Sequence, residues 1–224
     1  MIPSPEVVRE RLVRVRAAIA AACGRVGRDP ATVGVVVVTK GFPAEVARAA
    51  FEAGAEDLGE NYVQELRAKR EAAPGARWHF LGTVQANKAR AIAECHLVHG
   101  LEPGHGATRL GRVGAGRGTP VRCLAEVDFT GRRQGASPDG LPAFLETLRS
   151  DPGIDLRGLM TVAPPGSAEE ARRAFADLRA LRDRLGPDLP ELSMGMSGDY
   201  PVAVEEGATM VRIGTAVLGE RRDD

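Results

Sequence analysis

Apolar residues along this chain follow two different spacings. Residues 33–39 are apolar at almost every position, which is typical of a strand buried on both faces of a parallel sheet. Between residues 8 and 26, apolar side chains recur every three or four positions, which predicts one apolar face of a helix. Ser4-Pro5 precedes that stretch and has the residue types that start helices.

Strand and helix patterns then alternate to the end of the chain. Strands are predicted to begin near residues 33, 57, 77, 97, 121, 156, 191 and 210. Further helices are predicted over residues 43–53, 63–73, 85–94, 107–113, 138–148, after 167 and over 199–207. Such alternation without a long linker predicts a closed (β/α)8 TIM barrel with an extra N-terminal helix, in one domain of residues 1–224. An open doubly wound sheet is the alternative, because a sequence does not show strand order.

Composition then narrows the function classes. The formal net charge is +0 and aromatic residues are 4%, which argues against nucleic acid as a partner. No apolar run approaches the roughly 20 residues that span a bilayer, and residues 1–6 do not look like a secretion signal. The three cysteines lie far apart, as expected for unpaired thiols in a reducing compartment. We therefore expect a cytoplasmic protein with no membrane contact.

Lys40 is placed as a chemically useful amine. It ends the buried strand over 33–39, where a charged group is costly unless it is needed. The chain has 30 Lys and Arg residues, and only three of them are lysines, so arginine is its ordinary cation. A desolvated lysine can lose its proton and form a Schiff base, whereas arginine stays protonated. A lysine that reaches solvent from the strand end is the alternative.

Two loops rich in glycine and hydroxyl groups follow the last two predicted strands, at residues 193–199 and 212–215. In a (β/α)8 barrel, active sites lie at the carboxyl ends of the strands, and these two loops often hold a phosphate. Their backbone N–H groups can point at an anion, although ordinary turns use the same residues. An amine next to a phosphate site favours pyridoxal phosphate (PLP) as cofactor, and a sugar-phosphate aldolase would share these parts.

The histidines predict no metal site. His96 and His99 are three apart on a predicted strand, so we expect them on opposite faces, and no carboxylate cluster accompanies them. His79 lies in the third predicted strand. It is either a core residue or part of the barrel mouth, and we favour the mouth because strand ends carry the site.

Several ordered motifs match one known family. They are VTKGFP (38–43), LGENYVQE (58–65), WHFLGTVQANK (78–88), RGLMTVAP (157–164), LSMGMSGD (192–199) and GATMVRIGTA (207–216). On these motifs the chain resembles the pyridoxal phosphate homeostasis proteins, which look like the barrel half of bacterial alanine racemases. The resemblance covers nearly the whole chain.

The resemblance implies a set of cofactor-binding residues. They are Lys40 for a Schiff base with PLP, Ser197, Gly214 and Thr215 for its phosphate, Arg212 opposite the pyridine nitrogen, and Asn61 in the pocket wall. His79 joins this set through its expected place at the mouth. Residues 100–118 match the family poorly, and Gln134-Gly135 stands where the family usually has a lysine before glycine. This difference counts against a second cofactor site that uses that lysine.

The resemblance favours a cofactor carrier over an efficient enzyme, so we assign no catalytic residue. In the racemases a second base is a tyrosine from an additional β domain, but this chain ends nine residues after Thr215. An arginine opposite the pyridine nitrogen would keep that nitrogen unprotonated and weaken the ring as an electron sink. We expect a monomer that stores, delivers or buffers PLP, with PLP-dependent apo-enzymes as candidate partners. A low-efficiency racemase is the alternative, and a phosphate-sugar lyase is the third hypothesis.

Overall fold

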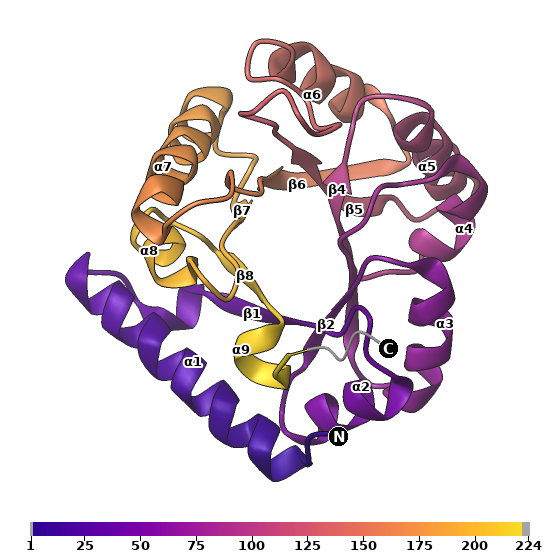
Figure 1. Cartoon of the computed structure of the whole chain (residues 1–224). Coiled ribbons are helices and arrows are strands. Elements are labelled where there is room, and N and C mark those ends of the chain that lie inside the picture. Colours follow the sequence, from indigo (N-terminus) through magenta and orange to yellow (C-terminus); the bar gives the residue numbers. More distant parts are fainter. Residues whose placement is uncertain (1, 221–224) are drawn as a thin grey trace.

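The structure, a computed structural model, describes residues 2–220, which form a closed barrel of parallel strands (Figure 1). The strands follow one another around the barrel in chain order, and the first pairs with the last. They are β1 Gly34–Val38, β2 Asp57–Glu60, β3 Arg77–Phe80, β4 Leu97–Leu101, β5 Val121–Glu126, β6 Ile154–Met160, β7 Glu191–Ser193 and β8 Met210–Ile213. The predicted barrel is confirmed, and the open doubly wound sheet is excluded.

Helices surround the barrel on its outside (Figure 1). They are α1 Pro5–Arg25, α2 Ala44–Glu52, α3 Val63–Ala72, α4 Ala89–Ile92, α5 His105–Gly116, α6 Leu141–Ser150, α7 Ala168–Leu185, α8 Tyr200–Glu205 and α9 Thr215–Leu218, with 3₁₀ turns η1 Pro30–Thr32 and η2 Ala86–Lys88. Among the described residues, none of these helices combines the length and apolar character needed to cross a membrane.

Two helices differ from the prediction. The helix expected over 85–94 is divided into η2 and the short α4, and the residues after Gly214, expected as a tail, form α9. A helix as short as α9 covers too few turns to give a sequence period. It is stabilised by burial of Val217 and Leu218 instead, which depends on tertiary packing.

The predicted N-terminal helix is confirmed as α1. Ser4 Oγ accepts a hydrogen bond from the Val7 N–H at 3.5 Å, and Pro5 occupies the first helical turn. The buried face of α1 consists of the apolar residues predicted from the spacing, Val8, Leu12, Val15, Ile19 and Ala22. This face packs against α2, α8 and α9, so α1 covers the side where the barrel closes between β1 and β8.

The apolar core has two parts. The larger part fills the layer between the strands and the surrounding helices. The smaller part consists of Leu97, Leu124, Met160 and Met210, which come from β4, β5, β6 and β8. β8 is not adjacent to the other three strands, so its side chain can meet theirs only inside the barrel. This cluster is therefore the internal core of the barrel.

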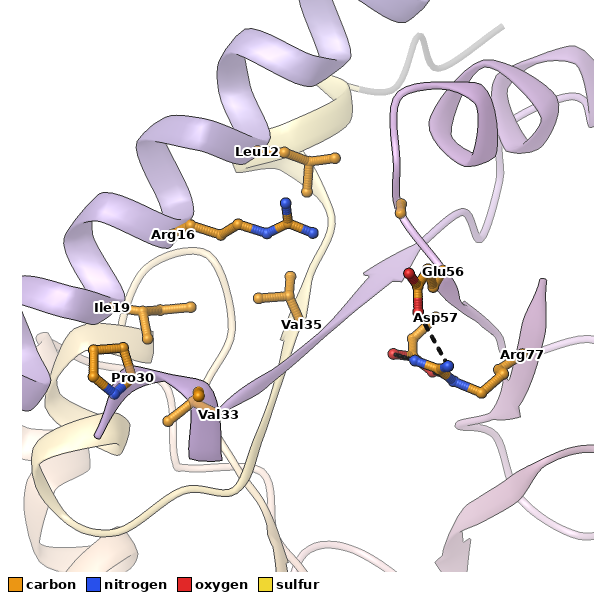
Figure 2. A pocket seen from close by; sticks show the side chains of 11 residues that line it. Leu12, Arg16, Ile19, Pro30, Val33, Val35, Glu56, Asp57 and Arg77 are labelled. Carbon is orange, nitrogen blue, oxygen red and sulfur yellow. Dashed lines mark hydrogen bonds and ion pairs between the residues drawn. The ribbon is translucent and has the colours of Figure 1, made fainter. Parts of the chain in front are cut away.

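A cavity of about 410 Å³ lies under α1 at the amino-terminal ends of the first strands (Figure 2). Leu12, Arg16 and Ile19 of α1 line one side, and Glu56 and Arg77 lie across from them as an ion pair at 3.1 Å. Lys40 follows the opposite, carboxyl-terminal end of β1. The cavity is therefore separate from the rim where the candidate residues gather.

Candidate functional site

Lys40 lies at the carboxyl-terminal rim, just beyond β1. The Thr39 N–H donates to the Gly59 carbonyl at 3.0 Å, which keeps this segment beside β2 after β1 has ended. Gly41 has φ +75°, a left-handed conformation that favours glycine, and it turns the chain toward α2. Lys40 itself is half-buried. The amine therefore extends from a short, tightly turned segment.

The loop after β8 lies on the same rim. In the parallel pairing of β1 and β8, Val37 is opposite Ile213. A Cβ placed on Gly214 would lie 3.6 Å from the Val38 carbonyl oxygen. The prediction that the first and last strands are neighbours is therefore confirmed. Their pairing places the backbone of Gly214 next to Val38, which is two residues before Lys40 in the chain.

The loops after β7 and β8 are bonded to each other. Ser197 Oγ accepts a hydrogen bond from the Ala216 N–H at 3.2 Å. Gly214 precedes α9, and Thr215 is the first residue of that helix. The structure thus joins Ser197, Gly214 and Thr215, the three residues expected to hold a phosphate, into one connected surface.

Arg212 is a buried cation next to these loops. Its side chain projects into the barrel from β8, and the residue is only 6% exposed. Nη1 donates to Ser193 Oγ at 2.6 Å and Nη2 donates to the Thr161 carbonyl at 2.8 Å, so both acceptors are neutral. Burial lowers the pKa of Arg212 to about 10. Arg212 is still protonated at neutral pH, and neither of these contacts neutralises its charge.

A chain of hydrogen bonds runs from Arg212 through the barrel interior. Ser193 Oγ lies 2.7 Å from His99 Nδ1, and His99 Nε2 lies 2.8 Å from His79 Nδ1. At the far end, His79 Nε2 lies 3.0 Å from Asp57 Oδ1. Asp57 is the first residue of β2, so this series of hydrogen bonds leads away from the rim toward the amino-terminal end of the barrel.

The direction of these hydrogen bonds follows from the charges at the two ends. Arg212 can only donate and the Asp57 carboxylate can only accept. Ser193 therefore accepts from Arg212, and His79 donates to Asp57 through Nε2. Burial lowers the pKa of His99 well below its ordinary value, which favours the neutral form of that ring.

His79 differs in position from the expectation that it lines the mouth. Both of its ring nitrogens are already bonded inside the barrel, to Asp57 and His99. It also lines a cavity of about 360 Å³ together with Arg77, the first residue of β3, and Glu191, the first residue of β7. His79 thus faces the amino-terminal end, and we place it behind Arg212.

The expectation that His96 and His99 lie on opposite faces is wrong. Both rings approach His79, with centroids 5.4 Å and 5.1 Å from its own. His96 precedes β4, so the alternation of side chains along that strand does not extend to it.

Asn61 lies on the same rim, directly after β2. A Cβ on Gly82 would lie 2.3 Å from the Asn61 carbonyl oxygen, so the close approach of the two loops requires glycine at that position. Asn61 also lines a cavity of about 460 Å³ with Tyr62, Thr83 and Lys88. The loops after β2 and β3 therefore form one wall at the rim.

Gln134 lies in the loop after β5. It lines a cavity of about 1050 Å³ between α5 and α6. In the same loop, Arg133 Nε donates to Glu126 Oε1 at 2.9 Å. The cation next to Gln134 is thus an arginine that is bonded to a buried carboxylate, and Gln134 itself stands where the family that the chain resembles usually has lysine.

A cluster of ionisable side chains lies directly behind Lys40. Lys69 Nζ is 2.6 Å from both Glu60 Oε1 and Glu65 Oε2. It also donates to the Thr39 carbonyl at 2.7 Å, and Glu65 Oε2 accepts from the Gly41 N–H at 2.9 Å. The two peptide groups held by this cluster are those on either side of Lys40.

The two carboxyl groups of this cluster have opposite pKa shifts. Burial raises the pKa of Glu60, against the opposing hydrogen bonds from Lys69 and Thr39. Burial also acts to raise the pKa of Glu65, but the hydrogen bonds from Lys69 and the Gly41 N–H outweigh it and lower the pKa. Glu65 is therefore the more acidic partner of the Lys69 ammonium.

Sequence reasoning missed Lys69, Glu65, His99 and Ser193. Lys69 carries a signal that could have been used, because it is one of three lysines in an arginine-rich chain and lies four residues after Glu65 on one helix face. His99 and Ser193 carry no such signal, because the partners of His99 (His79 and Ser193) and of Ser193 (His99 and Arg212) are distant in sequence.

The rim thus combines three kinds of group. It has the Lys40 amine, the buried Arg212 guanidinium, and backbone N–H and hydroxyl groups in the loop of Ser197 and at Gly214-Thr215. An amine can join a carbonyl compound, a guanidinium suits an acceptor atom, and these loops suit an anion. The arrangement fits a carbonyl compound that carries an anionic group.

Comparison with known proteins places the chain in a family. The model of the alanine racemase N-terminal domain matches residues 14–222. The pyridoxal phosphate homeostasis protein of Pseudomonas aeruginosa is 41% identical over 220 residues, which are 96% of each chain. That of Deinococcus radiodurans is 42% identical over 206 residues, 91% of this chain and 97% of its own. The solved structure of PipY from Synechococcus elongatus, with PLP bound, has a TM-score of 0.83 and 36% identity, and covers 95% of this chain and 100% of PipY.

Fold and sequence together therefore define a barrel of the alanine racemase N-terminal domain class. Its similarity to these relatives extends over almost the entire length of each. The chain belongs to the pyridoxal phosphate homeostasis protein family, as the motif resemblance predicted.

Proposed function

We propose that this protein binds PLP as a Schiff base on Lys40 and serves PLP homeostasis by storing, delivering or buffering the cofactor. The observation that carries the proposal is the arrangement of the rim, where Lys40, the buried Arg212 and the joined loops after β7 and β8 lie together. When bound, PLP supplies an aldehyde that condenses with a lysine amine with loss of water. The family relatives carry the name of this function.

Each rim residue has a role in this proposal. Ser197, Gly214 and Thr215 bind the phosphate through a hydroxyl group and backbone N–H groups. Arg212 donates a hydrogen bond to the pyridine nitrogen, and its two neutral acceptors leave its charge available for that purpose. Asn61 forms part of the wall. His79 does not contact the cofactor in this proposal. It orients Arg212 through the hydrogen bonds of His99 and Ser193.

Reduction with borohydride tests the proposal directly. The purified protein is mixed with PLP, the absorbance of the Schiff base is recorded, and the adduct is reduced and located by peptide mass spectrometry. Label on Lys40, lost in Lys40→Ala and retained in Lys88→Ala, is the expected result. A colourless wild-type protein that cannot be labelled would refute the proposal and favour a phosphate-sugar lyase.

Transfer of the cofactor to a PLP-dependent apo-enzyme tests the carrier role. Loaded wild-type protein should activate the apo-enzyme faster than an equal amount of Lys40→Ala mixed with PLP. Activation at the same rate by both would contradict delivery from Lys40. Size-exclusion chromatography with light scattering tests the proposal that the carrier is a monomer.

A carrier is favoured over a racemase by the position of Arg212. A guanidinium that donates to the pyridine nitrogen keeps that nitrogen unprotonated, which weakens the cofactor as an electron sink. Incubation with L-alanine and other L-amino acids in deuterated water separates the two functions, because sustained α-proton exchange above that of free PLP would indicate a racemase.

The proposed compartment is the cytoplasm. The three cysteines, Cys23, Cys95 and Cys123, are buried and unpaired. Burial raises the pKa of Cys95 to about 11, so this thiol stays protonated and unreactive. Unpaired thiols of this kind suit a reducing environment.

A further inference from the structure

The backbone around Lys40 is held from both sides by one buried cluster. Lys69 Nζ donates to the carbonyl of Thr39, the residue before Lys40, at 2.7 Å. Glu65 Oε2 accepts from the N–H of Gly41, the residue after Lys40, at 2.9 Å. Lys69 and Glu65 are in turn bonded to each other at 2.6 Å. Rotation of the backbone at Lys40 would break at least one of these three contacts.

Packing alone does not explain this cluster. Lys69 is 2% exposed and Glu60 is fully buried, and apolar side chains of similar volume generally stabilise such a position at least as well as buried ions do. Glu60 Oε2 has no hydrogen-bond partner among residues 2–220. A buried oxygen without a partner is unfavourable. The cluster is therefore less stabilising than an apolar one would be, but it keeps the Thr39 carbonyl and the Gly41 N–H hydrogen-bonded.

We infer that Lys69 and Glu65 are positioning residues for Lys40. They hold the Thr39 carbonyl and the Gly41 N–H so that the Lys40 amine points to one place at the rim. The inference rests on the proposed function, because it concerns the Schiff base that Lys40 forms. Reaction between an amine and a bound carbonyl group depends strongly on such orientation. Glu60 supports the pair by sharing the Lys69 ammonium.

Glu65 is the residue to vary. Its side chain is 29% exposed, and Lys69 keeps Glu60 as a partner when Glu65 is changed. Glu65→Ala removes the acceptor of the Gly41 N–H, whereas Glu65→Gln keeps an amide oxygen at that position. Arg67→Ala, an exposed residue on the same helix, is the matched control. Thermal unfolding of each variant reports its folding independently.

The experiment follows the rate of Schiff-base formation by stopped-flow absorbance after mixing with PLP. Glu65→Ala should react about tenfold more slowly than the wild type, and Glu65→Gln should recover most of the rate. Arg67→Ala should match the wild type. A general loss of stability would not be rescued by glutamine in this way.

The inference is overturned if Glu65→Ala reacts at the wild-type rate, or if Glu65→Gln is as slow as Glu65→Ala. Failure of the proposed function looks different, since the wild-type protein itself would then give no adduct on Lys40 after borohydride reduction. Peptide mapping of the reduced adduct, which separates Lys40 from Lys69 and Lys88, keeps the two outcomes apart.

Discussion

The two regions that flank Lys40 at the rim are built with different kinds of interaction. On the Lys40 side, three ionisable side chains, Glu60, Glu65 and Lys69, form a buried cluster against the backbone. On β8, the strand that pairs with β1, Arg212 has only neutral acceptors in Ser193 and Thr161. The Lys69 ammonium is matched by carboxyl groups, whereas the Arg212 guanidinium is left available.

This difference follows from what each cation has to do. Lys69 has a structural task, so its charge must be matched inside the protein, because an unmatched buried charge is strongly unfavourable. Arg212 is proposed to bond the ligand, so a carboxylate partner would compete with the pyridine nitrogen. Neutral hydrogen bonds orient Arg212 without removing its charge.

Lys69→Met should have the largest effect. Removal of the ammonium leaves the buried Glu60 carboxylate unmatched, so the free energy of unfolding should fall by about 3–5 kcal/mol in urea denaturation. The control is Arg173→Met, because Arg173 is 91% exposed and lies 3.9 Å from Asp177. This variant should change the free energy of unfolding by less than about 0.5 kcal/mol. Equal losses in both variants would contradict a special role for the buried cluster.

Arg212→Met should act mainly on binding. Loss of the charged donor should weaken PLP binding by about 2 kcal/mol, measured by titration of the Schiff-base absorbance. Arg122→Met removes a second arginine of the strands, at the amino-terminal end of the barrel, and should leave PLP affinity unchanged. If both variants bind PLP equally well, Arg212 does not contact the cofactor.

His99→Gln should alter how stability depends on pH. The pKa of His99 is lowered in the folded protein, chiefly by burial, so the unfolded chain binds more protons than the folded one below about pH 6.5. The free energy of unfolding should therefore fall as the pH drops from 7 to 5, by at most about 1.4 kcal/mol per pH unit for one proton. Urea titrations at each pH should show a flatter profile for His99→Gln. An unchanged slope would assign the effect to other groups.

Ser197→Ala should have the smallest effect. The variant loses the hydroxyl group that accepts from Ala216 at 3.2 Å and is proposed to bind phosphate. We expect PLP affinity to fall by about 1 kcal/mol, the size of one neutral hydrogen bond. Ser150→Ala, exposed on α6, should bind PLP as the wild type does. A loss of affinity in both would mean that the assay reports stability instead of phosphate contacts.

The sequence predicted the barrel well because its signals are local. Residues 33–39 show the unbroken apolar run of a buried strand, and the α1 stripe from Val8 to Ala22 shows a helical period. The fold then makes β1 and β8 neighbours, which links Lys40 to Gly214 as expected. Short elements such as α4 and α9 were missed or misjudged because they have too few turns to show a period.

The site was predicted only in part. Strand alternation gives the face on which a side chain lies but not its height in the barrel, so it did not show that His79 is bonded to Asp57 below the rim. Strand alternation also failed for His96 and His99, because His96 lies before the start of β4. The contacts predicted between the rim residues and PLP remain proposals.

The amino-acid sequence by itself determined the order of strands and helices, the family and the position of the Lys40 amine along the chain. Only the tertiary structure decided that Lys69 and Glu65 hold the peptide groups around Lys40, and that Arg212 begins a hydrogen-bonded chain ending at Asp57. Periodicity is a property of neighbouring residues, whereas these contacts depend on the registers of strands that are distant in sequence.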